Sequence, residues 1–260
     1  MKVELKYKLE ALFGLFSTII FSIMLILAVL YSPNYSFFEN YISDLAYFSG
    51  KLFFAIGFSI FGVFLVPFFI TLERELVYIN ENIRRLATAI AILTCACFAL
   101  GSIIPEESYL ELFTVFHSFI AGFAFFFSGI YILLFSFLMF RSYEVEEYSG
   151  PRFHLFLVTF GFITAIGEFI LIFIFVPILE WVVVISMIVW ITITSVHLLI
   201  HKFIRFPLAE FKRLKHSESI EIFKAIQKKI EDLNIDDELL SDAIDNNISL
   251  LKSRNDGKKV

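Results

Sequence analysis

The chain has 260 residues, of which 58% are hydrophobic and 18% charged, with 35 phenylalanines, a mean hydropathy of +0.81 and a formal charge of −5. This is more apolar surface than one soluble core of this size can bury, so the composition excludes an ordinary soluble domain and predicts a polytopic membrane protein. Nucleic-acid binding is also excluded, because the sequence contains no compact basic module.

Six apolar stretches are each long enough to cross about 30 Å of hydrocarbon. Backbone polar groups inside a bilayer need internal partners, and the stretches lack the alternation of porin strands, so we expect helices. The predicted fold class is therefore all-α, a six-transmembrane-helix bundle over residues 1–202. The predicted spans are residues 10–31, 51–71, 86–104, 112–140, 153–176 and 180–201.

Basic residues indicate the orientation of these spans. They precede the first span and follow the second, fourth and sixth, whereas the other connections are acidic and hold only Lys51. By the positive-inside rule we expect both termini on the cytoplasmic side of a cell membrane and residues 31–50 outside. The apolar run 11–31 is longer than a signal-peptide core and lacks a small-x-small cleavage site, so we expect it to be retained.

The C-terminal segment 203–260 has a different composition. Apolar residues recur at helical spacing within 222–233 and again within 239–251, separated by an acidic turn. We expect two amphipathic cytoplasmic helices that pack on each other, on the membrane surface, on a second copy of the chain or on a cytoplasmic partner. A solubilising, partly ordered tail is the alternative.

Small residues predict where the membrane helices pack closely, since helices in lipid associate through close backbone approach. One such ladder lies on the third span and a second on the fourth span. The first comprises Ala87, Ala91, Cys95 and Ala99, and the second comprises Thr114, Ser118 and Gly122. Beside the second run His117, Ala121, Ala124 and Ser128, so we expect His117 to face other helices.

Four ionisable residues suggest a ligand site near the external side. Glu168 lies deep in the fifth span, about 7 Å beyond the midplane, and His117 is expected at a similar depth, which invites a Glu–His pair. Glu106 and Asp44 would lie above them, with Asp44 as a lid from the 31–50 loop. Such a crevice suits protons, cations or a cationic or polyhydroxyl head group. The alternative is that Glu168 is a protonated structural clasp between helices.

Three histidines on the cytoplasmic side, His154, His197 and His201, could ligate zinc as an open catalytic set. A histidine pair four residues apart on the last span is similar to alkaline ceramidase and adiponectin-receptor-like intramembrane hydrolases. Those proteins have seven spans and an earlier histidine that this chain lacks. We therefore favour no metal site, interpret these histidines as interfacial contacts to lipid phosphates, and identify no cofactor.

A family resemblance is carried by the segments "SPNYSFFENYISDLAYFSG" and "FHSFIAGFAFF" and by Pro105-Glu106. In these segments the chain resembles a prokaryotic six-span family, domain-of-unknown-function family 998. The resemblance covers about residues 10–202 and implies a six-span architecture near the Frag1/DRAM/Sfk1 group, without an assigned activity. This chain has Ala46 where the family commonly has glycine, which weakens the case for a tight turn there.

Three functions are compatible with these features. We favour a non-catalytic bundle that binds membrane lipids or a small ligand, or that acts as a scaffold, with an external polar crevice. A proton- or cation-coupled transporter is the alternative, although no midspan proline stands beside Glu168 as a discontinuous helix would require. An intramembrane metal-dependent lipid hydrolase comes last, because its ligands and the acidic crevice lie on opposite membrane sides. No catalytic residue is assigned.

Overall fold

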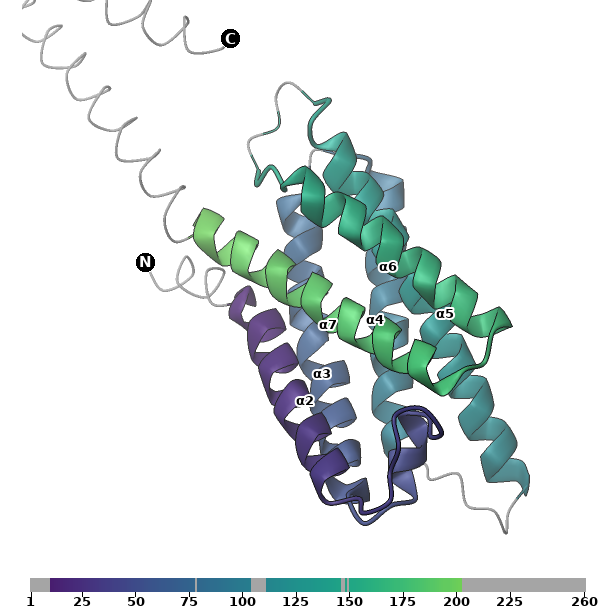
Figure 1. Cartoon of the computed structure of the whole chain (residues 1–260). Helices are drawn as coiled ribbons and strands as arrows, with labels where there is room; N and C mark the ends of the chain where they lie inside the picture. Colours follow the sequence, from purple (N-terminus) through teal and green to yellow (C-terminus); the bar gives the residue numbers. More distant parts are fainter. Residues whose placement is uncertain (1–9, 78, 104–110, 146–147, 149, 203–260) are drawn as a thin grey trace, which may run out of the picture. The chain divides into compact units, whose positions relative to one another are not determined.

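A computed structural model of the chain describes residues 10–77, 79–103, 111–145, 148 and 150–202. These residues form helices and contain no strand, which confirms the predicted all-α class, and six of the helices are long and apolar enough to cross a membrane (Figure 1). The predicted tail, 203–260, lies outside the described residues. The elements are α2 (Leu12–Leu30), the short 3-10 helix η1 (Ser43–Ala46), α3 (Lys51–Glu75), α4 (Glu81–Ile103), α5 (Glu111–Arg141), α6 (Leu155–Phe173) and α7 (Pro177–Ile200).

The ends of the helices differ from the hydropathy boundaries where polar residues begin a helix. α4 starts at Glu81 rather than 86, because the Asn80 side chain accepts a hydrogen bond from the Ile83 N–H at 3.1 Å. α7 starts at Pro177, a residue suited to the first helical turn, where its missing N–H costs nothing. Helix α3 continues through Pro67 to Glu75.

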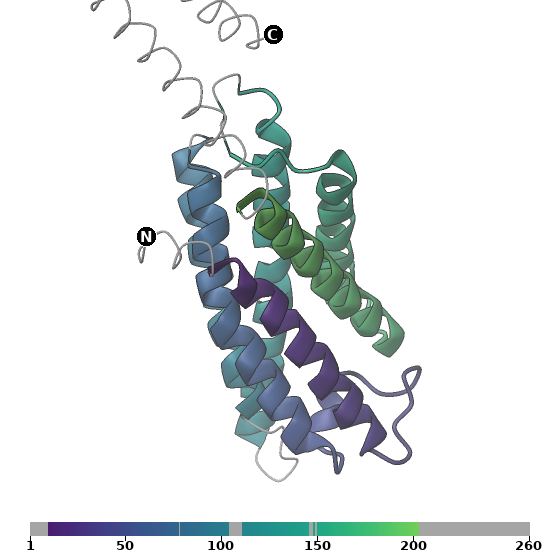
Figure 2. The same cartoon turned by 90° about the vertical axis from the view of Figure 1, so that its left-hand side faces the viewer.

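The six long helices alternate in direction, so the connection 31–50, the α6–α7 turn, the end of α4 and the start of α5 lie at one end of the bundle, which we call the loop end (Figure 1). Figure 2 shows α2 beside α3 and the 31–50 connection next to them. α5 has 31 residues and α6 only 19, and α5 continues past the α6–α7 turn. The 31–50 connection occupies the corner that this difference leaves.

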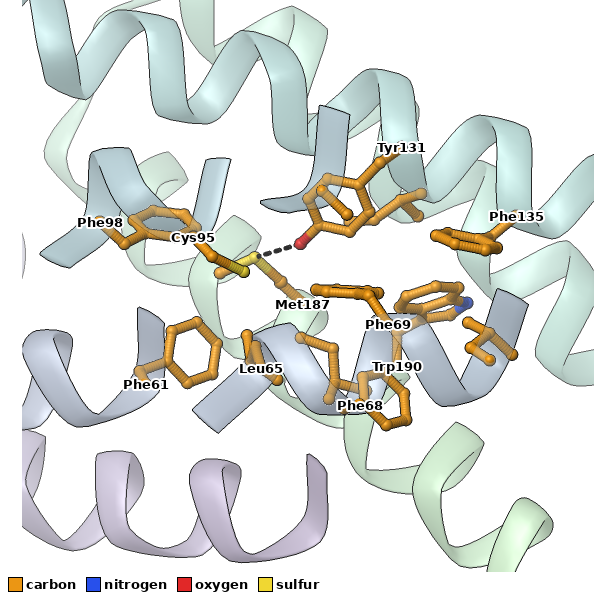
Figure 3. Close-up of a cluster of buried hydrophobic side chains, with 14 of the residues drawn as sticks. Phe61, Leu65, Phe68, Phe69, Cys95, Phe98, Tyr131, Phe135, Met187 and Trp190 are labelled. Carbon is orange, nitrogen blue, oxygen red and sulfur yellow. Dashed lines mark hydrogen bonds between the residues drawn. The ribbon is translucent and has the colours of Figure 1, made fainter. Parts of the chain in front are cut away.

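Aromatic side chains from α3, α5 and α7 fill the centre of the bundle (Figure 3). The Phe69 ring lies 4.8 Å from the ring of Tyr131 and stacks on Phe135 at 5.8 Å. The Tyr131 hydroxyl donates to the Met187 sulfur at 3.5 Å, and Trp190 is fully buried beside them. Close ring packing of this kind lets a bundle without a hydrophobic driving force gain dispersion energy.

The small residues of the third span pack closely against α3 as their spacing predicts. A Cβ atom added to Gly62 of α3 would lie 2.4 Å from the Cys95 carbonyl oxygen and 3.2 Å from the Ala99 Cβ. Ala87 and Ala91 of the same ladder are fully buried. The third span therefore packs against α3 through this face, and both cysteines of α4 are free thiols. The ladder predicted on the fourth span does not pack in this way, because Ser118 is exposed and a Cβ atom on Gly122 would meet nothing within 4 Å.

Candidate functional site

The 31–50 loop begins with a tight turn that the sequence specifies. The Tyr35 N–H donates to the Ser32 carbonyl at 3.1 Å, with Pro33 and Asn34 at the central positions. Asn34 has a φ of 74°, as the third residue of a type II turn requires, and asparagine tolerates this left-handed conformation better than other side-chain-bearing residues. The turn sends the chain back over the bundle.

The loop is tied to the start of α7 by a chain of hydrogen bonds. The Trp181 Nε1–H donates to the Tyr35 hydroxyl at 3.0 Å, and that hydroxyl donates to the Tyr41 carbonyl at 2.8 Å. The Tyr41 hydroxyl donates to the Phe175 carbonyl at 2.9 Å. Burial raises the pKa of Tyr35 above its ordinary value, so its hydroxyl keeps the proton that it donates. The loop is therefore held against the α6–α7 turn.

Two carboxyl groups complete this contact. The Ile42 N–H donates to Glu180 Oε2 at 2.7 Å, which joins the loop to a buried side chain of the first turn of α7. The Tyr41 N–H donates to Asp44 Oδ2 at 2.7 Å, so that Asp44 closes its own turn around η1. Asp44 is half-buried and Glu180 is 5% exposed. Both carboxyl groups are thus fixed by backbone donors.

A cavity of about 500 Å³, which we call the outer chamber, lies between α5, the α6–α7 turn and the 31–50 loop. Gly122 of α5 opens it, since a Cβ atom there would meet nothing within 4 Å. Its lining combines polar and apolar residues, and we call these two sets the polar wall and the apolar wall. The polar wall comprises Tyr41, Ser43, Asp44, His117, Ser118 and Glu180, and the apolar wall comprises Ala121, Phe125, Leu171, Ile172 and Phe175.

A smaller cavity of about 40 Å³, the inner chamber, adjoins the outer chamber. The two share Ser43, His117 and Glu180 among their lining residues. Beyond these the inner chamber is lined mainly by apolar side chains of α3, α4 and α5. The polar residues therefore stand at the boundary between the two chambers.

The structure brings together two of the four residues predicted for the crevice. Asp44 of the loop and His117 of α5 line the same chamber. Glu106 lies outside the described residues. Glu180 is a lining residue that the sequence interpretation missed, because it stands at the boundary of an apolar run and reads as an ordinary loop acid. Glu180 is the fourth residue of a helix that begins at Pro177, and this position in the sequence could have indicated that it belongs to the helix and not to the loop.

Glu168 lies apart from Asp44 and His117. It is fully buried and packs against α5 where a Cβ atom on Gly129 would lie 3.1 Å from the Glu168 Cβ. Gly129 follows His117 by twelve residues, or about 18 Å along the helix. The expected pair between Glu168 and His117 at one depth is therefore not formed, and Glu168 lines neither chamber.

Neither carboxyl oxygen of Glu168 has a hydrogen-bond partner among the described residues. The Ser128 hydroxyl is close enough to act on the carboxyl group, but it donates to the Phe125 carbonyl at 2.7 Å. A neutral carboxyl group fits such a place, because an ionised one would need donors or a counter-charge. The hydrogen bond that a clasp between helices would need is absent among the described residues, so the clasp also stays a prediction.

The histidines of the opposite end have local structural contacts. His154 Nδ1 accepts the Phe156 N–H at 3.1 Å and caps α6. The His197 ring lies 5.0 Å from the Phe153 ring. Within the described ranges, no three His, Cys, Asp or Glu side chains are grouped so that they could hold a metal ion.

Comparison with known proteins gives one match. The family model described as "Protein of unknown function (DUF998)" matches residues 15–197, which include all six long helices in whole or in large part. No curated protein and no solved structure matches the chain.

Proposed function

The chain belongs to the DUF998 family of proteins of unknown function, and we propose that it binds an amphiphile without catalysing a reaction. The head group occupies the outer chamber, and the hydrocarbon part lies along the apolar wall. The observation that carries this proposal is that two carboxyl groups and an imidazole face one cavity of about 500 Å³ whose other wall is apolar. Amphiphile sites combine these two surfaces.

The exposed side chains around the outer chamber support entry of a lipid from the side of the bundle. Phe175 of the apolar wall is 69% exposed, and Ser118 of α5 is also exposed. In a membrane, side chains exposed at this position on α5 and the α6–α7 turn face lipid or the head-group region. A lipid could therefore enter between α5 and the α6–α7 turn without crossing the bundle.

Charge favours a cationic head group. Among the residues that the structure describes, those that line the outer chamber include Asp44 and Glu180 but no lysine or arginine. A positive group would offset these carboxylates, whereas an anionic group would be repelled by them. By the positive-inside rule, the chamber opens on the external side of a cell membrane, with the N-terminus in the cytoplasm.

Coupled transport has a weaker basis. Glu168 is the residue that would support it, but this carboxyl group lines neither chamber. A metal-dependent hydrolase would need a group of metal ligands, and the part of the chain that the structure describes contains no group of three or more His, Cys, Asp or Glu side chains that could hold a metal ion. Binding therefore has the stronger support.

Native mass spectrometry of the full chain with phosphatidylcholine, phosphatidylethanolamine or phosphatidylglycerol tests the proposal. We expect at least one of the two amine-bearing lipids to be retained more than phosphatidylglycerol. Gly122→Leu fills the open space of the outer chamber and should weaken that retention at least ~10-fold, or ~1.4 kcal/mol. Ala96→Leu, which places the same new side chain on an exposed face of α4, is the matched control. Equal retention by both variants would refute binding in this chamber.

A further inference from the structure

The inner chamber has an unusual lining for a place next to two carboxyl groups. Its wall contains four phenylalanines that form a continuous series of ring contacts. The Phe54 and Phe58 rings lie 4.7 Å apart, Phe58 and Phe98 lie 5.9 Å apart, and Phe98 and Phe125 lie 6.3 Å apart. The first three are no more than 6% exposed. The chamber therefore presents aromatic carbon on several sides.

Carboxyl groups stand at the mouth of this chamber. Glu180 lines both chambers and accepts one hydrogen bond, from the Ile42 N–H. A carboxylate has about four acceptor positions, so this bond leaves capacity for a positive group. Asp44 lines the adjoining outer chamber together with Glu180. A cation at the mouth would be attracted by both groups in their ionised form.

Beyond Ser43, His117 and Glu180 at its mouth, the inner chamber offers little to a head group that needs hydrogen bonds. Its Ser102 hydroxyl already donates to the Ala99 carbonyl at 2.9 Å and lies 3.1 Å from the Ser59 hydroxyl. A primary ammonium has three N–H donors that must be satisfied when it leaves water. An alkylated ammonium carries its positive charge with fewer donors, or with none when it is quaternary. Its methyl groups can lie against aromatic rings.

The size of the chamber is suitable for such a group. A volume of about 40 Å³ corresponds to about three water-sized groups, at roughly 10–15 Å³ each. This space admits only a small part of a head group. A phosphate is no larger than a trimethylammonium group, so the neighbouring carboxyl groups, and not the size of the chamber, disfavour an anion there.

We propose that the inner chamber receives the methylated ammonium group of the bound amphiphile, with the four phenylalanine rings around the methyl groups and Glu180 next to the charge. This inference rests on the proposed function, because it identifies which head group the amphiphile carries. The remainder of the head group would lie in the outer chamber beside Tyr41, Ser43 and Ser118.

The test compares three lipids that share their acyl chains: phosphatidylcholine, phosphatidylethanolamine, and the analogue in which carbon replaces the choline nitrogen. We expect the full chain to retain phosphatidylcholine at least ~10-fold better than the carbon analogue, since cation–π attraction and the carboxylate act only on the charge. It should also be preferred to phosphatidylethanolamine. Equal retention of phosphatidylcholine and the carbon analogue would overturn the inference.

Variants test whether the preference for phosphatidylcholine arises in the inner chamber. Phe98→Leu should remove most of the preference for phosphatidylcholine over the carbon analogue, whereas Phe126→Leu, at a ring 42% exposed and outside both chambers, should keep it. If Phe98→Leu does not fold, Glu180→Gln serves the same purpose, because it removes the charge and keeps an acceptor for the Ile42 N–H. An unchanged preference in the folded variant refutes the inner chamber as the site.

If phosphatidylcholine and phosphatidylethanolamine bind equally well and Gly122→Leu weakens both, the inference fails and the proposed function stands. If Gly122→Leu has no effect, the proposed function itself fails.

Discussion

Glu180 and Glu168 are both buried carboxyl groups of the last two helices, yet their surroundings differ. Glu180 accepts the Ile42 N–H at 2.7 Å and faces two chambers. Glu168 is fully buried, has no hydrogen-bond partner among the described residues and packs against Gly129. The first carboxyl group can meet a ligand and the second cannot be reached from either chamber.

This difference shows that depth in a membrane span is a poor guide to function by itself. The cost of burying an ionisable group can be met by protonation as well as by a ligand. A binding role needs accessible space and fixed donors or acceptors next to the group. In this bundle those conditions occur together at the loop end, where helices of unequal length leave room.

The largest expected effect on the free energy of unfolding is seen by comparing two glycines of α5. Gly129 packs beside Glu168, and Gly122 lines the outer chamber. Gly129→Leu should lower the free energy of unfolding by about 2–3 kcal/mol, because the new side chain must enter the contact with Glu168 and Phe169. Gly122→Leu should change it by less than about 1 kcal/mol, since a Cβ there meets no atom within 4 Å. Thermal unfolding in detergent measures both. Equal destabilisation would mean that the outer chamber is not open in the membrane protein.

An intermediate effect concerns the carboxyl group that faces the chambers. Glu180→Ala should cost about 1–2 kcal/mol, because the Ile42 N–H is left without its acceptor. Glu180→Gln should cost less, as its amide oxygen can accept the same bond. Release of the loop can be followed by Trp181 fluorescence in a Trp190→Phe background, since Trp181 donates to Tyr35 of the loop. If both Glu180 variants behave alike, the hydrogen bond does not hold the loop.

The smallest expected effect concerns the carboxyl group in the packed region. Glu168→Leu should leave the free energy of unfolding within about 1 kcal/mol of the wild type, or raise it, because an apolar side chain of similar size replaces polar atoms without partners. Glu168→Gln is the matched polar control, and chemical unfolding in mixed micelles measures both variants. A loss above about 2 kcal/mol for Glu168→Leu alone would show that the carboxyl group makes a stabilising bond.

The sequence by itself determined the class of protein and the approximate positions of the helices. Long apolar runs have few stable alternatives in a bilayer, because every backbone polar group must be satisfied within the segment. The small residues Ala87, Ala91 and Cys95 could likewise be assigned to close helix contacts before their partners were known, because helices in lipid associate through close backbone approach. The family resemblance, which rests on short sequence segments in the loop and in the fourth span, also agrees with the match over residues 15–197.

Only the tertiary structure decided which ionisable residues meet. Depth counted along each span assumes helices of similar length that cross the membrane alike, and this placed His117 and Glu168 at one level. α5 has 31 residues and α6 has 19, so the register between them puts Gly129, and not His117, beside Glu168. The meeting of Asp44, His117 and Glu180 depends on the fold of the 31–50 loop onto α7. Contacts between segments more than a hundred residues apart follow from packing and hydrogen bonding in three dimensions, which hydropathy along the chain does not record.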